Sequence, residues 1–512
     1  MKNDGFDLSI HFVILAMAEN RTMIQFFEWH IPDHGLHWKQ AAHQAKNLAG
    51  TGFNMVWLPP PYKGAAGIKS VGYDVYDMYD LGEFDQKDTV RTKYGPKEDY
   101  LVAVRSLQAN GIKVIADVTF DHKIGADETE KVMVTDVNPE NRTEDIGKPH
   151  EIQAWTKFFF PGRADKYSNF HWNKDHFTAT DFDEATKKTG IYRFEGKTWS
   201  RDIDDENGNA DFLMGADIDI DHPEVEQEFI NWGKWFIDTS KIDGFRLAAA
   251  KHVSFSAQKK WIDEMTNYLK EKYPNKDIYA VGDYWSGDCS KLLNYIDQTG
   301  GLISLFDVPL HFHMLEAATS DGKYDMSKLY QDTITEKRPE LSITFADDHD
   351  TQPGQPLSSY IPPWFKPIAY TLILLRGAGT PCIFYGAYYG VPQEGVSPVS
   401  GIKKLVKIRQ LYAYGEEKLY FDNHNVVGFT RSGDHEHWDS GLAVLVTNFK
   451  GGSKKMEVGK HLAKTHMKDA LLRNSKVVEI DDDGFGEFWV DDGAAAVWVT
   501  ENAWEYLYTE IV

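Results

Sequence analysis

The sequence has few cysteines, a shortage of basic residues relative to acidic ones, and no long apolar run. Its 512 residues contain only Cys289 and Cys382, which excludes a dense disulfide framework, and we expect two ordinary thiols rather than one bridge. Lysine plus arginine number 55 against 78 acidic residues, giving a net charge of −23. This balance argues against nucleic acid or an anionic membrane surface as a partner and is compatible with a neutral substrate and bound cations.

The N-terminal residues give mixed evidence about the cellular compartment. Residues 10–18 form a short apolar stretch that ends in Ala-Met-Ala, the form of a signal sequence with its cleavage site. The residues before it include Asp4 and Asp7, whose charge has the wrong sign for a signal. We therefore expect a cytoplasmic protein, with secretion as the alternative, and regard residues 1–20 as an N-terminal extension. No apolar run is long enough to cross a membrane.

From residue 22 onward, short apolar stretches alternate with segments that have apolar residues at helical spacing. Eight strands are predicted, at 22–27, 53–58, 113–118, 242–247, 278–281, 302–306, 342–346 and 381–385. Helices are predicted between them, for example at 38–48, 97–110, 224–240 and 257–272. Eight alternations predict an α/β fold, a (β/α)8 TIM barrel built from residues 21–122 and 223–412, with its chemistry at the carboxyl ends of the strands.

Two regions depart from this alternation. Residues 123–222 are too many for a connecting loop and contain their own aromatic residues, so we predict an inserted subdomain after the third strand. Beyond residue 412, six short strands are predicted among Gly- and Asp-rich turns, at 426–430, 441–447, 455–458, 475–480, 486–490 and 495–499. This pattern predicts a C-terminal antiparallel β-sandwich domain over residues 413–512.

The segment 243–252 (DGFRLAAAKH) poses the central question of the sequence. Alternation along a strand places Arg246 and Ala248 on the same face. A charged arginine on an inward face requires a carboxylate partner. Position 248, the first place to look for that partner, holds only a methyl group.

Four strand-end segments carry a family resemblance: 117–122 (DVTFDH), 244–252 (GFRLAAAKH), 281–285 (VGDYW) and 345–351 (FADDHDT). Together with 22–29, 71–76, 81–84, 213–223 and 364–367, they resemble the signature segments of the α-amylase family of retaining glycoside hydrolases. In detail the chain is most similar to bacterial liquefying and cytoplasmic α-amylases, over nearly its whole length. The resemblance implies endo-hydrolysis of α-1,4-glucosidic bonds in starch, glycogen or maltooligosaccharides by double displacement.

By this resemblance, position 248 holds the nucleophile, position 283 the general acid, and Asp350 binds hydroxyls of the sugar ring. The chain departs from the family at two of these positions. Ala248 has no carboxylate with which to attack the anomeric carbon. Asp283 is one methylene shorter than the usual glutamate, and misplacing the acid in this way can by itself lower the rate strongly. Asp348 and Ala387 also differ from the usual asparagine and acidic residue.

We therefore expect hydrolysis to be abolished or crippled in this chain. The alternative is a catalytically inactive α-glucan-binding protein, either a natural pseudoenzyme or an engineered variant. A third interpretation has a water in the space beside Ala248 and slow inversion, which would require a wider separation of Asp283 and Asp350, about 6.5–9.5 Å.

The resemblance also implies a set of sugar contacts. From the residues alone, a tyrosine in an apolar run is usually core and a lone histidine usually structural, so it is the family match and the shared location at strand ends that favour function. The implied substrate-binding residues are Tyr73, His122, Arg246, Lys251, His252 and His349.

Alternating aspartates suggest a cation site. Asp217, Asp219 and Asp221 would share one face of an extended segment and repel one another without a cation, although the residues alone favour turn and helix-capping roles before Pro223. The resemblance implies a structural Ca²⁺ between barrel and insert, held by Asp121, Asp211, Asp217 and the carbonyl of His252. A further cluster of Asp181, Asp219 and Asp221 occurs in liquefying relatives, but Ser200 replaces one partner and argues against it here. We expect an α-glucan as the partner and a monomer.

Overall fold

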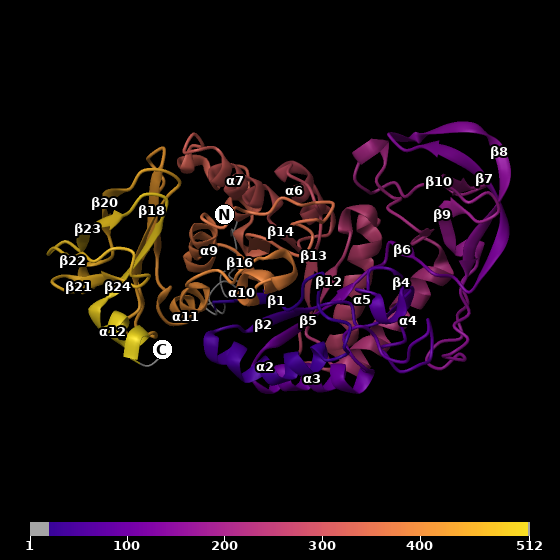
Figure 1. Cartoon of the computed structure of the whole chain (residues 1–512), viewed down its shortest axis with the longest axis horizontal. Coiled ribbons are helices and arrows are strands. Elements are labelled where there is room, and N and C mark those ends of the chain that lie inside the picture. Colours follow the sequence, from indigo (N-terminus) through magenta and orange to yellow (C-terminus); the bar gives the residue numbers. More distant parts are fainter. Residues whose placement is uncertain (1–19, 510–512) are drawn as a thin grey trace, which may run out of the picture.

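The computed structural model describes residues 20–509 and contains a closed barrel of eight parallel strands (Figure 1). Neighbouring strands follow the order β1-β16-β15-β14-β13-β12-β5-β2, and β2 pairs with β1 to close the ring. The barrel strands are β1 (Met23–Gln25), β2 (Met55–Leu58), β5 (Lys113–Val118), β12 (Gly244–Leu247), β13 (Tyr279–Gly282), β14 (Ser304–Phe306), β15 (Ser342–Phe345) and β16 (Thr380–Phe384). All eight predicted strands are confirmed.

Amphipathic helices connect the strands and cover the outside of the barrel. Their first turns carry the expected signals: α4 begins at Pro223 behind the capping side chain of His222, α5 is capped by Ser254 and α6 by Asp288. No helix within residues 20–509 is long and apolar enough to cross a membrane. The helices are α2 (His37–Thr51), α3 (Lys97–Ala109), α4 (Pro223–Ser240), α5 (Phe255–Lys272), α6 (Cys289–Gln298), α7 (Val308–Thr319), α8 (Ile334–Lys337), α9 (Lys366–Leu375), α10 (Tyr385–Tyr389) and α11 (Ile402–Tyr412).

The insertion after β5 is a six-stranded antiparallel sheet, with the long β7–β8 hairpin at its outer edge (Figure 1). Its strands are β6 (His122–Lys123), β7 (Glu128–Asn138), β8 (Asn141–Lys157), β9 (Phe177–Asp183), β10 (Lys188–Phe194) and β11 (Ala216–Ile218). β6 begins just after the barrel strand β5 and pairs with β11, so that Asp217 lies opposite His122. This pairing brings the aspartate-rich segment to the rim of the barrel. A two-stranded sheet of β3 (Lys63–Gly64) and β4 (Val75–Asp77) lies on the preceding barrel loop.

The C-terminal part consists of a six-stranded and a two-stranded antiparallel sheet that share a core including Leu445, Phe488 and Trp498. The strands are β17 (Glu417–Tyr420), β18 (Val426–Arg431), β19 (Leu442–Thr447), β20 (Gly452–Glu457), β21 (His466–Asp469), β22 (Val477–Glu479), β23 (Phe485–Val490) and β24 (Ala495–Thr500), followed by helix α12 (Glu501–Thr509). The sequence pattern missed β17 and β21, whose mostly polar residues lack an apolar alternation, and it missed α12.

Cys289 in α6 and Cys382 in β16 are buried free thiols. The predicted N-terminal extension, apart from residue 20, lies outside the described residues.

Candidate active site

Arg246 lies at the centre of the polar groups at the carboxyl end of the barrel. β12 pairs with β5 so that Arg246 lies opposite Asp117. The guanidinium is 2% exposed, and its Nη1 donates to Asp117 Oδ1 and Oδ2 at 2.9 and 3.1 Å. Its Nη2 donates to Asp283 Oδ2. Neighbouring strands therefore supply the carboxylates that this inward arginine requires, and position 248 is not needed for that purpose.

Asp117 is the functional residue that the sequence reasoning did not single out. Besides Arg246, it accepts hydrogen bonds from Trp57 Nε1 at 3.0 Å and from the Tyr73 hydroxyl at 2.7 Å. Complete burial raises the pKa of its carboxyl, and the charge of Arg246 opposes that shift. The sequence did contain a signal for Asp117. An inward arginine needs a carboxylate partner, and Asp117 lies near the end of the predicted strand that precedes the strand of Arg246.

Backbone pairing places position 248 beside position 283. The amide of Ala248 donates to the carbonyl of Val118 at 2.8 Å, and the amide of Ala250 donates to the carbonyl of Asp283 at 2.8 Å. Ala248 is 7% exposed, and the Asp283 side chain is 13% exposed. The carboxyl of Asp283 thus reaches the cleft, whereas its neighbour at position 248 presents only a methyl group.

The loop after β15 adds two more carboxylates. Asp348 Oδ1 accepts the backbone N–H groups of Asp350 and Thr351 at 3.0 and 2.8 Å, which fixes the loop. Burial, together with the charge of Asp283, raises the pKa of Asp348 to about 7. Burial and the charges of Asp348 and Asp283 also raise the pKa of Asp350, with Arg246 opposing. The cleft therefore holds carboxyl groups that can carry protons near neutral pH.

Tyr73 and His349 stack face to face at the same rim, with Tyr73 half-buried and His349 only 1% exposed. Their rings stack with centroids 5.4 Å apart and planes 17° from parallel. Burial and the nearby Arg246 charge hold the pKa of His349 well below its usual value, so its imidazole is neutral. Its Nδ1 is buried without a hydrogen-bond partner in the protein. The half-buried ring of Tyr73, supported by His349 behind it, is the aromatic face at this rim on which a sugar ring can pack.

The other predicted sugar contacts are engaged within the protein. His122 bridges Asp121 and the backbone of Tyr73, at 2.7 and 2.8 Å. The ammonium of Lys251 contacts Glu206 of the insert at 2.5 Å. His252 Nδ1 forms a hydrogen bond with the carbonyl of Ala210 at 2.6 Å. Together these three side chains connect the barrel to the insert.

Residues 42–438 match the family model described as the catalytic domain of α-amylase. The chain belongs to the α-amylase family. It is 49% identical to an α-amylase of Geobacillus stearothermophilus over 487 residues, which cover 94% of this chain and 88% of the relative. It is 39% identical to the cytoplasmic α-amylase of Escherichia coli (strain K12), covering 94% of this chain and 99% of that protein.

Solved structures support the fold. The structure of an α-amylase from Geobacillus thermoleovorans, complexed with acarbose, superposes with a TM-score of 0.62 at 19% identity, covering 94% of this chain and 98% of that one.

This member of the α-amylase family has a cluster of buried carboxylates where barrel and insert meet. Oδ1 of Asp121 and Oδ2 of Asp217 are buried without a hydrogen-bond partner. Burial raises the pKa of Asp211 to about 7, even though the Ser200 amide donates to it at 2.8 Å. Burial and the charges of Asp211 and Asp121 also raise the pKa of Asp217. Unsatisfied oxygens on mutually repelling carboxylates are the donor set that a hard cation such as Ca²⁺ prefers.

The neighbouring aspartates are engaged in a different way. Asp219 forms an ion pair with Lys197 at 2.7 Å, and Asp181 Oδ2 accepts the Gly215 amide at 2.7 Å. Asp221 lies at the surface, yet partial burial and the charges of Asp202 and Asp219 raise the pKa of its carboxyl. The ammonium of Lys197 therefore compensates the charge of Asp219.

A second group of metal-type ligands, not predicted from the sequence, consists of His176, His222 and Glu224. The Nδ1 atoms of the two histidines accept the backbone N–H groups of Asn173 and Glu224, at 3.1 and 3.3 Å. Each neutral ring therefore carries its proton on Nε2 and offers no lone pair there. His176 Nε2 donates to Glu224 at 3.0 Å. The hydrogen bonds of these three residues therefore belong to the N-terminus of α4.

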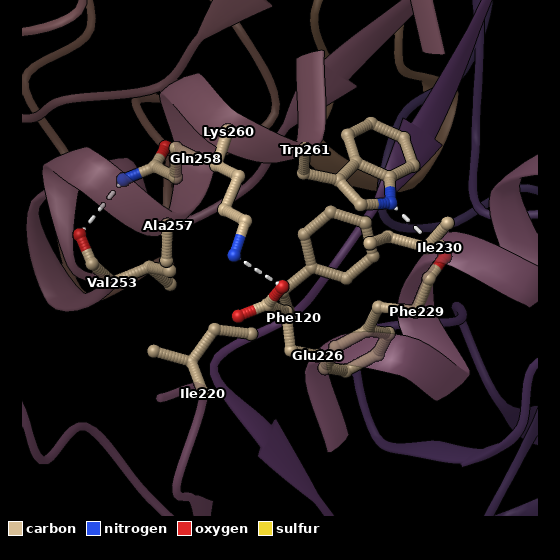
Figure 2. Close-up of a pocket in the computed structure, with 10 residues that line it drawn as sticks. All are labelled: Phe120, Ile220, Glu226, Phe229, Ile230, Val253, Ala257, Gln258, Lys260 and Trp261. Carbon is tan, nitrogen blue, oxygen red and sulfur yellow. Dashed lines mark hydrogen bonds and ion pairs between the residues drawn. The ribbon is translucent and has the colours of Figure 1, made fainter. Parts of the chain in front are cut away.

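A small cavity lies behind the carboxylate cluster, between α4 and α5 (Figure 2). Its volume is about 20 Å³, and most of its lining is apolar, including Phe120, Phe229 and Trp261. Lys260 and Glu226 pair at 2.5 Å beside it. This space can hold one water at most, so it belongs to the packing of the two helices.

Proposed function

We propose that the chain is an α-amylase-type protein that binds α-1,4-glucans over Tyr73 and His349, and that hydrolysis there is crippled or lost. Relatives named α-amylase, 39–49% identical over almost the whole chain, support the substrate class. The observation that carries the proposal is the pairing of Arg246 with Asp117 and Asp283 while position 248 offers only a methyl group.

The proposed roles follow from this geometry. Asp283 would supply the proton to the glycosidic oxygen as the C–O bond breaks, in the role that the family gives to this position. Asp350 would bind ring hydroxyls. No carboxylate at position 248 is present to form the glycosyl-enzyme bond, so double displacement lacks its first covalent step. In addition, Asp121, Asp211, Asp217 and the carbonyl of His252 would hold a Ca²⁺ that neutralises the buried carboxylates between barrel and insert.

The test measures reducing-end release from soluble starch with Ca²⁺ present. The parent chain is compared with the single variants Ala248→Asp and Asp283→Glu and with the double variant. An Ala185→Asp, Asp277→Glu double variant makes the same two exchanges at exposed positions as a matched control. We expect a silent parent, a silent control and an active double variant. Equal activity in the parent and the double variant would remove position 248 from the mechanism.

A glucan-binding protein without turnover is the second candidate, favoured by the intact Tyr73–His349 surface. It predicts maltooligosaccharide binding by calorimetry and no reducing-end release even in the double variant. Residual product from the parent would be examined for anomeric configuration, because inversion would indicate a water acting beside Ala248.

A further inference from the structure

A large cavity lies between the outside of the barrel and the C-terminal sheets. Its volume is about 970 Å³, at the upper end of the range for small-molecule sites. Its lining comes from α2, α10, the loop before α11, α11 itself and α12, together with Leu471 after β21. None of the proposed glucan- or calcium-binding residues lines it.

Positive charge gathers in this cavity although the chain as a whole carries −23. Four lysines, Lys46, Lys403, Lys404 and Lys407, are among its lining residues, and no aspartate or glutamate of residues 20–509 is. Within residues 20–509, none of these four ammonium groups forms an ion pair with a carboxylate, whereas most other lysines there do. An uncompensated cluster of this kind is electrostatically unfavourable unless an anion joins it.

The contacts of the lysines leave their charge unbalanced. Lys404 Nζ donates to the Tyr508 hydroxyl at 2.5 Å, and Lys407 Nζ donates to the Gly50 carbonyl at 2.6 Å. Burial lowers the pKa of both lysines. The nearest opposing carboxylate, Asp469, acts on Lys404, but its two oxygens already accept four backbone N–H groups at 2.7–3.0 Å.

The start of α11 adds to the positive potential. The helix begins behind Gly401, which has a φ of +83° and provides no capping side chain. Its first turn contains Lys403 and Lys404 and no acidic residue, which is opposite in sign to what the helix dipole favours. Ser400, Gly401, Ile402 and Lys403 all line the cavity, so the first turn of α11 borders it. The Ile402 amide donates to the Val399 carbonyl at 3.4 Å, and the next amides of a first turn have no partner within the helix.

We infer that this cavity is a binding site for a small molecule carrying two or more phosphate groups. The α11 amides and the ammonium groups of Lys403 and Lys407 would bind the phosphate oxygens, because helix N-termini and lysine charges are phosphate-binding groups. Tyr388 and Tyr508, also in the lining, hold lysine side chains there: Lys403 Nζ lies 5.3 Å from the ring centroid of Tyr388 and Lys404 Nζ lies 3.9 Å from that of Tyr508. The site is independent of glucan binding.

The test is isothermal titration of the full chain at low salt with pyrophosphate, ATP, a hexose phosphate and maltotriose. We expect pyrophosphate or ATP to bind, and the Lys403→Gln, Lys407→Gln double variant to lose about tenfold or more in affinity. The matched control is Lys113→Gln, Lys270→Gln, which removes two exposed lysines far from α11 in the sequence and should bind as the parent does. Ser400→Glu, at an exposed position, should weaken binding by adding a competing carboxylate.

Two results would overturn this inference. The first is no binding of pyrophosphate or ATP up to about 10 mM. The second is an equal loss in both double-lysine variants, since that would show general charge attraction. Maltotriose should bind the parent and the Lys403→Gln, Lys407→Gln variant equally, because the proposed glucan site lies elsewhere. Unchanged thermal unfolding of Ser400→Glu verifies that weaker binding comes from the site.

Discussion

Replacing Asp348 with asparagine should stabilise the protein at alkaline pH and leave its stability nearly unchanged at acid pH. The asparagine Oδ1 can accept the same backbone N–H groups, from Asp350 and Thr351, that Asp348 Oδ1 accepts now. The exchange therefore removes a buried negative charge, repelled by Asp283, without removing the hydrogen bonds that fix the loop.

The size of the effect follows from the pKa. Burial and Asp283 raise the pKa of Asp348 from an ordinary 3.8 to about 7. A carboxyl whose pKa is higher in the folded state binds protons on folding. The loss of folding stability caused by its ionised form is therefore absent below about pH 4, grows up to about pH 7 and is complete above it. Three pH units correspond to an upper bound of about 4 kcal/mol, and sharing of protons with Asp350 reduces the net gain at pH 8 to about 1–3 kcal/mol.

The assay is urea-induced and thermal unfolding of the parent and Asp348→Asn at pH 5 and pH 8, with calcium fixed. The control Asp277→Asn removes an exposed carboxylate and should shift neither midpoint at either pH. A gain for Asp348→Asn that is equal at both pH values would refute the reasoning, because only a titrating buried charge gives the difference. A loss of stability at pH 8 would mean that this charge is compensated in the folded state.

Two further predictions concern the insert. Chelation by EDTA should lower the unfolding temperature, and added Ca²⁺ should restore it. Asp217→Asn should abolish this response. Asp219→Asn should keep it, because that carboxylate is already paired with Lys197. Arg163→Ala should lower the unfolding free energy by about 3–5 kcal/mol, because Arg163 and Asp77 are paired at 2.9 Å and each is only 1% exposed. The control Lys187→Ala, at an exposed pair with Glu184, should lower it by under about 1 kcal/mol. Equal losses in the two variants would contradict the role of burial.

The sequence was sufficient for the barrel and for the location of the site. Apolar stretches alternating with helical spacing identify all eight strands, because a parallel sheet buries both faces of each strand. Residues that end those strands, such as Arg246, Asp283 and Asp350, converge because the carboxyl ends of parallel strands share one rim.

Side-chain partnership could not be read from the sequence in the same way. Asp117 and Arg246 are 129 positions apart and meet only through the β5–β12 register. The pairing of Lys197 with Asp219 likewise depends on how the insert folds on itself, whereas Asp121 and His122 are neighbours in the sequence. The four lysines of the large cavity come from α2 and α11, and no local pattern connects them.

The arrangement around Arg246 explains how the fold tolerates an alanine at position 248. If a carboxylate there were the main partner of Arg246, its loss would leave a buried, unpaired guanidinium, which is strongly destabilising. Here Asp117 and Asp283 occupy both terminal nitrogens, so the charge stays paired without any group at position 248. Adding an aspartate at that position places one more carboxylate beside Asp283, Asp348 and Asp350. We therefore expect Ala248→Asp to gain catalytic function at some expense of stability at neutral pH, and Asp348→Asn to recover that stability in the same chain.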